Sequence, residues 1–352
     1  MKRIKVAIVG LRHLHPRSYM AHFAVMPEIE VVAVAEGDKS LRAQFAGEFN
    51  LRDYPNWREL FENESLDLAA IFLPHVDCPD AAKAAIEKNI HVLIEKPMTA
   101  DSGSARQVVD LADEKQIKVT TPYVWRYHPV VREIKGLLDS GALGEIIGCT
   151  GRCAAGRLHR YIDGHAEWML DAKKSGGGPM YNLGVHWIDL FLWLLQDKVI
   201  AVSGKNMKIN EHYNIEDNSF SILTFRSGAV LMLDVCYTVP ASFPHGRDLF
   251  ISIRGTKGVL SWAPAYEGEK DELFICSDAD EFRGAPVQRR SYEMTPAPGY
   301  SGIMGLLYLK DVAHSILNNT PAPIPGRDGV LVLEIVEAIY QSSLDGIVVE
   351  LW

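Results

Sequence analysis

The sequence has little that would bind a polyanion or cross a membrane. Its 36 lysine and arginine residues are outnumbered by 45 aspartate and glutamate residues, which gives a formal net charge of -9. A chain with this balance lacks the basic surface of a nucleic-acid-binding protein or of a protein that docks on anionic lipid. No uninterrupted apolar stretch approaches the roughly 18 residues that a membrane-spanning helix needs. We therefore expect a small-molecule partner, and neither nucleic acid nor a membrane.

Cysteine is also scarce. The chain has five, an odd number without CxxC spacing, which argues against a disulfide framework and against a structural zinc site. The basic start, Met1 to Lys5, is followed by an apolar run that stops at Gly10, too short for the core of a signal peptide. These features predict a cytoplasmic protein.

What is present is the composition of a globular protein. The chain has 352 residues, of which 47% are hydrophobic and 23% charged, so it can bury sizeable cores. Its length predicts about two domains. We place the boundary between a dinucleotide-binding domain at residues 1–122 and a substrate-binding and oligomerisation domain at residues 123–352.

The first part alternates apolar strands with helical segments. This alternation predicts a doubly wound parallel sheet, and therefore an α/β domain of the dinucleotide-binding (Rossmann) type. The expected strands are 4–10, 30–36, 68–73, 91–94 and 118–123, and the expected helices are 16–26, 57–63, 81–88 and 104–115.

After residue 122 the pattern changes to successive strands joined by hairpin turns. Turns at 226–228 and 255–258 link two strand pairs, which is typical of an antiparallel sheet in an α+β domain. We expect a helix over 129–138, strands over 145–154, 200–208, 219–224, 229–238, 249–254, 259–262 and 272–276, and closing helices over 303–317 and 329–343. The first closing helix is a candidate to pack back on the N-terminal domain.

The phosphate-binding turn has lost most of its glycines. Where G-x-G-x-x-G is expected, residues 10–15 read G-L-R-H-L-H, so only Gly10 remains. One interpretation is that Arg12, His13 and His15 bind phosphate through their side chains at a helix N-terminus. A second is that the two histidines help to bind a metal ion, although no third ligand is evident and we assign no metal site. A third is that all three are ordinary polar loop residues.

Glu36 ends the second expected strand. In a βαβ unit an acid at this place hydrogen-bonds the adenosine ribose, and it disfavours a 2′-phosphate. We therefore expect NAD as the cofactor, with NADP less favoured.

Two further strand ends carry candidate site residues. The apolar run His91 to Ile94 ends abruptly in Glu95-Lys96-Pro97, and ligands of open α/β sheets bind just outside such carboxyl ends. Pro74 follows another strand and would line the same crevice. A charged loop without any function is the alternative to a site here.

A glycine-rich loop at 176–178 leads into a long apolar helix that carries a polar stripe. Asn182 and His186 are four residues apart and Asp189 three further, so they share nearly one helical face. Such a stripe is either satisfied internally or lines a cavity.

Other polar and aromatic residues cluster in two loops. One follows the last parallel strand and the other precedes Trp168, and both suit hydrogen bonding to a polyol or a sugar acid, although the second could equally be a solvated surface loop. The candidate residues are Arg126, Tyr127 and His128 in the first, and Arg157, Tyr161 and His165 in the second.

Several motifs in this order resemble the family of glucose-fructose oxidoreductase, inositol dehydrogenase and the rhizopine-catabolism oxidoreductases (Gfo/Idh/MocA). They span nearly the whole chain. The segments that carry the resemblance are Glu95-Lys96-Pro97, W-R-Y-H-P at 125–129, G-A-L-G-E-I at 141–146, the triple-glycine helix, G-T-K-G at 255–258 and E-A-I-Y-Q-S at 337–342.

The resemblance implies a Rossmann domain, a second domain with a large open sheet that often mediates oligomers, and hydride transfer between NAD(P) and a hydroxyl of a sugar or cyclitol. It assigns catalysis to Lys96, Asn182 and His186, with Asn182 standing where the family has aspartate. From the turn, the strand ends and the loop after the last parallel strand we predict cofactor contacts by Gly10, Arg12, His13, His15, Glu36, Pro74, Glu95, Lys96 and Arg126. From the two polar loops and the residues that the resemblance assigns to catalysis we predict substrate contacts by Lys96, Tyr127, His128, Arg157, Tyr161, His165, Asn182 and His186.

We therefore expect an NAD-dependent sugar or polyol oxidoreductase that assembles as a homodimer or homotetramer through its C-terminal sheet. Two alternatives stay open at this point. One is an enzyme that retains its nicotinamide for redox-neutral elimination, hydration or glycoside cleavage. The other is a non-enzymatic sensor of sugar or dinucleotide, which the altered turn and Asn182 would permit.

Overall fold

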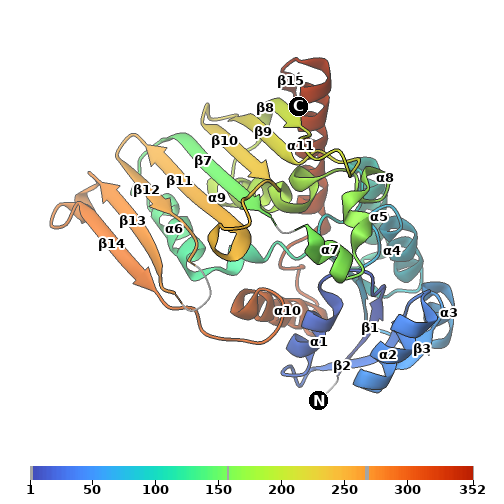
Figure 1. Cartoon of the computed structure of the whole chain (residues 1–352). Helices are drawn as coiled ribbons and strands as arrows, with labels where there is room; N and C mark the ends of the chain where they lie inside the picture. The colour runs from blue at the N-terminus through green and yellow to red at the C-terminus, as the bar shows by residue number, and fades with distance from the viewer. Residues whose placement is uncertain (1–2, 157, 266–268, 352) are drawn as a thin grey trace. The chain divides into compact units, whose positions relative to one another are not determined.

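The computed structural model describes residues 3–156, 158–265 and 269–351. The chain forms two compact units, each described here by itself. The first comprises Met1–Val124, His159–Gly177 and Pro296–Leu333, and the second comprises Trp125–Leu158, Gly178–Thr295 and Glu334–Trp352. Each unit has one sheet at its centre (Figure 1).

The first unit is built on a parallel six-stranded sheet with the order β3-β2-β1-β4-β5-β6. This is the strand order of a dinucleotide-binding fold, in which ligands bind outside the carboxyl ends of the strands. The central strands β1, β4 and β5 are buried except at Lys5, which is exposed, and His91, which is partly buried, as their mainly apolar sequences predict. The strands are β1 (Ile4–Val9), β2 (Ile29–Ala35), β3 (Arg52–Tyr54), β4 (Leu68–Ile71), β5 (His91–Ile94) and β6 (Val119–Thr120).

Side-chain caps fix where the helices around this sheet begin. Asp38, Asn56 and Asp101 each accept a hydrogen bond from an amide of the first helical turn, and Pro16 occupies the first turn of α1. The helices are α1 (Pro16–Phe23), α2 (Lys39–Phe49), α3 (Trp57–Asn63), α4 (Cys78–Glu87) and α5 (Ser102–Lys115).

Two later segments return to the first unit. One holds α7 (His159–Asp163), the short helix η2 (Glu167–Leu170) and α8 (Ala172–Ser175). The other holds α10 (Gly302–Leu317), which contacts α1 and β1, and the first part of α11 (Gly326–Asp345). Tyr308 of α10 is fully buried, and its hydroxyl lies 2.9 Å from Thr120 Oγ1.

The second unit is built on a nine-stranded sheet with the order β14-β13-β12-β11-β7-β10-β9-β8-β15 (Figure 1). In the described chain β7 pairs in parallel with β10, and the other neighbours in this sheet are antiparallel. The strands are β7 (Ile146–Ala155), β8 (Val199–Met207), β9 (Asn218–Phe225), β10 (Val230–Cys236), β11 (Arg247–Gly255), β12 (Gly258–Trp262), β13 (Asp271–Ser277), β14 (Val287–Tyr292) and β15 (Val349–Glu350).

Helices pack beside this second sheet. The polar stripe lies at the start of a helix that opens with a π-helical turn, η3 (Met180–Gly184), and continues as α9 (Val185–Leu195). Trp187 of α9 is completely buried and donates its indole N–H to the Phe250 carbonyl. The remaining short helices are η1 (Val124–Tyr127), α6 (Pro129–Asp139), η4 (Pro244–Gly246) and η5 (Asp280–Phe282).

The predicted fold class, a parallel α/β sheet followed by a larger and mostly antiparallel sheet, is confirmed. The strand expected over 118–123 is shorter, Val119–Thr120, because the backbone turns at Thr121 to Tyr123 and enters η1. In the described part of the chain no helix has the length and apolar character needed to span a membrane.

Candidate functional site

The turn after β1 retains a backbone that only glycine suits. Gly10 has φ +90°, and a Cβ atom there would lie 3.0 Å from the carbonyl group of Phe72. Its amide donates to the Ala35 carbonyl at 2.9 Å. The first glycine of the fingerprint is thus held by both the positive φ and the close approach of the β4 end.

Glu36 stands at the end of β2, as the sequence predicts for a ribose-binding acid. Its buried carboxylate accepts N–H bonds from Leu11 at 2.8 Å and from Asp38 at 2.9 Å. The first of these bonds ties the glycine-poor turn to the strand end. A carboxylate has about four acceptor positions, so two amides leave capacity for hydroxyl groups.

Arg12 does not extend over the turn as a free cation. Its guanidinium pairs with Glu167, and both side chains are half exposed. Its carbonyl accepts the indole N–H of Trp168. The segment that returns to the first unit near residue 167 is therefore anchored on the turn, and Arg12 is the anchor point.

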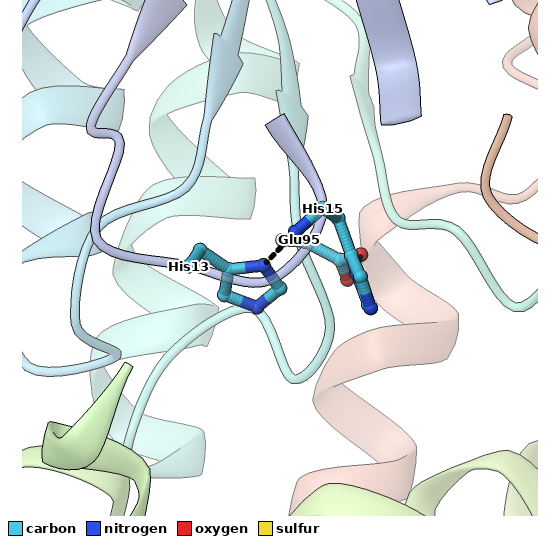
Figure 2. Close-up of side chains that lie close together, drawn as sticks. All are labelled: His13, His15 and Glu95. Atoms are coloured by element: carbon cyan, nitrogen blue, oxygen red, sulfur yellow. Dashed lines mark hydrogen bonds and ion pairs between the residues drawn. The ribbon is translucent and has the colours of Figure 1, made fainter. Parts of the chain in front are cut away.

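His13 is buried and His15 is partly buried, and both lie beside Glu95 at the end of β5 (Figure 2). His15 Nδ1 lies 2.5 Å from Glu95 Oε1, and the His15 amide donates to His13 Nδ1 at 3.2 Å. Ligand-capable atoms of His13, His15 and Glu95 all lie within 4.8 Å of one another. The structure thus joins two histidines of the turn to Glu95, a carboxylate that the sequence did not indicate as their partner.

Burial and neighbouring charge set the protonation of this cluster. Burial lowers the pKa of His13 well below its usual range, and the charges of His15 and Lys96 act in the same direction. Burial alone would raise the pKa of Glu95, but His15, His13 and Lys96 hold it at about 2. The cluster therefore presents an ionised carboxylate and a neutral imidazole in a buried place.

Lys96 is 4% exposed, directly after the buried β5 strand. Its amide donates to the carboxylate of Glu95. Pro74 follows β4, and its carbonyl accepts the Asp77 amide at 2.8 Å just before α4. The carboxyl ends of β1, β2, β4 and β5 therefore carry Gly10, Glu36, Pro74 and Lys96 respectively, on one edge of one sheet.

Three aromatic residues beside the turn were not predicted as site residues. Tyr300 stacks on His15 with ring centroids 3.8 Å apart. The buried ring of His75 lies 4.8 Å from that of Trp168, which in turn lies 6.1 Å from that of His13. They come from loops distant in sequence, so no local pattern points to them.

In the second unit a buried acid holds the triple-glycine loop. Glu216 accepts the Gly178 amide at 2.9 Å and the hydroxyl of Tyr340. A Cβ atom on Gly178 would clash with the Glu216 carbonyl, which explains a glycine there. Burial raises the pKa of Glu216.

Asn182 and His186 lie on the two parts of the helix that follows. Asn182, in the π-helical turn, donates its side-chain N–H to the Tyr237 hydroxyl at 2.8 Å. His186 is 7% exposed in the first turn of α9. π-helical turns inside helices are frequent at functional sites, because they shift the register of the side chains that follow.

Asp189 forms a buried bidentate ion pair with Arg126. Its two carboxylate oxygens accept Nε and Nη2 at 2.9 and 2.5 Å, and both side chains are buried. The polar stripe is thus satisfied at this end by an internal partner. The assignment of Arg126 to cofactor binding stays a prediction.

The other predicted substrate residues lie in different settings. Tyr127 is buried under the Arg132 guanidinium, and buried His128 caps α6 through Val130 with Nε2 3.5 Å from Asp271 Oδ2. In the first unit Tyr161 is buried and accepts an N–H from Arg160, whereas His165 is exposed with φ +57°. Arg157 lies outside the described residues.

A parallel sheet of order 3-2-1-4-5-6, a glycine turn after β1 and an acid ending β2 define a dinucleotide-binding protein. Two family models match the chain. Residues 4–123 match the oxidoreductase family's NAD-binding Rossmann fold, and residues 135–351 match its C-terminal alpha/beta domain. The chain belongs to the Gfo/Idh/MocA oxidoreductase family, as the resemblance predicted.

Relatives extend over nearly the whole chain. D-xylose 1-dehydrogenase (NADP(+)) 2 of Haloferax volcanii is 24% identical over 331 residues, which cover 92% of this chain and 93% of that protein. D-glucoside 3-dehydrogenase of Escherichia coli is 22% identical and covers 99% of this chain and 97% of its own. The solved structure of a levoglucosan dehydrogenase, in complex with NADH, has a TM-score of 0.85 at 19% identity and 99% coverage of both chains.

Proposed function

We propose that this protein is an NAD-dependent dehydrogenase that transfers hydride between a hydroxyl or keto group of a sugar, polyol or sugar acid and the nicotinamide. The observation that carries the proposal is the placement of Gly10, Glu36 and Lys96 at the carboxyl ends of β1, β2 and β5 in one parallel sheet. Relatives named as xylose, glucoside and inositol dehydrogenases support the substrate class.

The cofactor assignment rests on the turn and on Glu36. The turn after β1 faces the N-terminus of α1, where amide groups and the helix dipole favour an anion such as a pyrophosphate. The side chains of His13 and His15 are proposed to supply polar groups to the pyrophosphate, because the missing glycines would have let the backbone approach it closely. The carboxylate of Glu36 disfavours a 2′-phosphate through like-charge repulsion, which supports NAD over NADP although several relatives are named for NADP.

Lys96 is the proposed electrophilic catalyst. Alcohol oxidation requires a group that holds the negative charge on oxygen as the hydride leaves, and a buried ammonium is worth more there than in water. The adjacent ionised Glu95 carries the opposite charge to Lys96 and offsets part of the desolvation cost of the buried ammonium.

His186 is the proposed base that removes the hydroxyl proton. Imidazole titrates near neutral pH and can take a proton at each turnover. Asn182 is the proposed second substrate contact, and its bond to Tyr237 orients its amide. Tyr127, His128, Tyr161, His165 and Arg157 are proposed as further substrate contacts because they are polar or aromatic residues of the two predicted loops.

The outer face of the second sheet is the proposed contact between copies of the chain. Phe220 and Ile222 of β9 and Met232 of β10 are 42%, 47% and 53% exposed, and adjacent positions of both strands are buried on the opposite face. Large apolar side chains grouped in this way typically mark an interaction surface. A homodimer or homotetramer formed through this face would bury them.

A spectrophotometric assay tests the proposed function. The purified protein is mixed with NAD or NADP and with a panel of aldoses, cyclitols and sugar acids, and formation of the reduced nicotinamide is followed. We expect turnover of at least one of these with NAD. Substrate consumption without net NADH would indicate a redox-neutral reaction instead, and cofactor binding without any turnover of the panel would favour a sensor.

A further inference from the structure

The cluster of His13, His15 and Glu95 has the composition of a metal site. Two of its members come from the turn after β1 and the third from the end of β5, and their ligand-capable atoms lie within 4.8 Å of one another (Figure 2). We propose that these three side chains bind one divalent transition-metal ion of the zinc or cobalt type. This inference goes beyond the proposed function, because hydride transfer to a nicotinamide does not require a metal.

The donor set selects the class of ion. Two imidazoles and one carboxylate, without a thiolate, are suited to Zn²⁺, Co²⁺, Fe²⁺ or Mn²⁺ rather than to a soft ion. Three protein ligands leave at least one coordination position open, as in catalytic rather than structural zinc sites. Ca²⁺ and Mg²⁺ prefer oxygen ligands and would be poorly served by two nitrogens.

His13 supplies a second and independent observation. Its side chain is 4% exposed, and Nε2 has no hydrogen-bond partner among the residues that the structure describes. A buried polar nitrogen in this state carries the cost of lost hydration without compensation. Its other nitrogen, Nδ1, accepts the His15 amide at 3.2 Å. An ion on Nε2 moves the ring proton to Nδ1, so the ring gives up this long contact when it binds the ion.

His15 and Glu95 form the second half of the site. His15 Nδ1 and Glu95 Oε1 are 2.5 Å apart, which places a proton between them in the metal-free state. An ion bound by both atoms replaces this proton, and the two atoms move apart to ligand distances of about 2.0 to 2.2 Å from the ion. The displaced proton moves to Nε2 of the His15 ring, so the imidazole stays neutral when it binds the ion through Nδ1.

The charges around the cluster moderate the affinity. Glu95 contributes one negative charge, whereas Lys96 and Arg160 are cationic groups that act on the cluster electrostatically. A divalent ion here adds positive charge beside the phosphate-binding turn. The added positive charge favours an anion at the open coordination position, beside a turn whose missing glycines would have let the backbone approach a phosphate closely.

The test is a titration of the full-length protein with Co²⁺ in the absence of any dinucleotide. The protein is first dialysed against a chelator and then against chelator-free buffer, and the visible d–d absorption of bound Co²⁺ is followed. Zn²⁺ is titrated in parallel by calorimetry. We expect one ion per chain, with intense absorption typical of low-coordinate Co²⁺.

The variants His15→Ala and Glu95→Gln should each weaken Co²⁺ binding more than about 100-fold, beyond the 10- to 100-fold typical of residues that only support a ligand. The matched control is His75→Gln, which removes another buried histidine with an unpartnered Nε2 outside the cluster. It should leave Co²⁺ binding unchanged.

Wild-type protein that gives neither Co²⁺ absorption nor Zn²⁺ heat would overturn the inference, and this measurement does not depend on whether a variant folds. Binding that persists in both cluster variants would also overturn it, because the ion would then be held elsewhere. Since no dinucleotide is present, either result leaves the dehydrogenase proposal untouched, and failure of that proposal leaves the metal titration interpretable.

Discussion

Asn182 and Tyr237 are joined by a hydrogen bond of 2.8 Å from the side-chain amide to the hydroxyl. This bond lies one helical turn before His186, at the position where the resemblance implies an aspartate. An aspartate beside a histidine raises the basicity of the imidazole, whereas an amide adds no charge. The pair therefore identifies where this chain departs from its family in electrostatics while keeping the helix.

The change Asn182→Asp tests this departure. We expect the added carboxylate to raise the pKa of His186, so the acid limb of kcat/KM moves to higher pH. The measurement is a pH profile of kcat/KM for the substrate found in the panel assay. Tyr237→Phe is the control, because it removes the partner of Asn182 without adding charge and should leave the acid limb in place. An unmoved limb in Asn182→Asp contradicts the role of His186 as base.

Lys96→Ala should lower kcat by about 100-fold to 10,000-fold, the range typical of acid–base groups. Dinucleotide affinity should change far less, because the turn and Glu36 remain. Lys88→Ala, an exposed lysine after α4, is the control and should behave as wild type. Full turnover in the Lys96 variant would remove this residue from the chemistry.

Glu36→Gln should weaken NAD binding and reduce the ratio of the affinity for NAD to the affinity for NADP. Loss of charged hydrogen bonds costs about 1.5 to 3 kcal/mol, or roughly 10- to 150-fold in affinity. The glutamine can still accept the Leu11 amide, so the turn keeps its position. Calorimetric titration with both dinucleotides measures the ratio. A ratio equal to that of wild type would show that Glu36 only supports the turn.

Removing one partner of the buried ion pair between Arg126 and Asp189 should destabilise the protein strongly. Asp189→Ala removes the bidentate partner of a buried guanidinium and should lower the free energy of unfolding by about 3 to 5 kcal/mol. The double change Arg126→Met with Asp189→Leu removes both charges and should recover most of that loss. Urea unfolding of both variants tests this. If the single and the double variant lose the same free energy of unfolding, the loss comes from altered packing and not from the charge left without its bidentate partner.

Acid should destabilise the protein partly through His75. Burial is the main effect and lowers the pKa of His75 to about 4. The hydrogen bond to the Ser175 carbonyl raises this pKa, the charge of Lys96 lowers it and the charge of Glu95 raises it. The unfolded chain takes up this proton near pH 6.5, so the stabilisation is complete above that pH and is lost as the pH falls toward 4. The contribution is up to about 3 kcal/mol.

His75→Gln removes that titration. Its free energy of unfolding should therefore fall less steeply between neutral pH and pH 4 than that of wild type, whatever its stability at neutral pH. Denaturant unfolding at several pH values measures both slopes. If the free energy of unfolding falls equally steeply with pH in wild type and variant, groups other than His75 cause the loss of stability in acid.

The parallel sheet was predictable because its central strands are continuous apolar runs with a glycine or a charged residue directly after them. The sequence pattern did not predict α2 and β3, because the residues from Lys39 to Tyr54 are largely polar and exposed. It also omitted β14, Val287–Tyr292, an edge strand with few apolar residues. All three elements bury too few side chains to produce a periodic hydrophobic pattern in the sequence.

Within the site, the residues that the sequence indicates are those with local motifs. Gly10, Glu36 and Lys96 each end an apolar run. The contact of His15 with Glu95 joins residues 80 apart in sequence, and Tyr300 reaches His15 from the other end of the chain. No periodicity links such residues, so the metal-type cluster emerges only once the turn is folded over the end of β5.

The central claim is that the glycine-poor turn still holds a nicotinamide dinucleotide. Calorimetric titration of the purified protein with NAD, NADH, NADP and NADPH, after removal of copurified cofactor, tests it most directly. We predict saturable binding of NAD and NADH with weaker binding of the phosphorylated pair. Absence of binding by all four would contradict the account of this protein as a dehydrogenase.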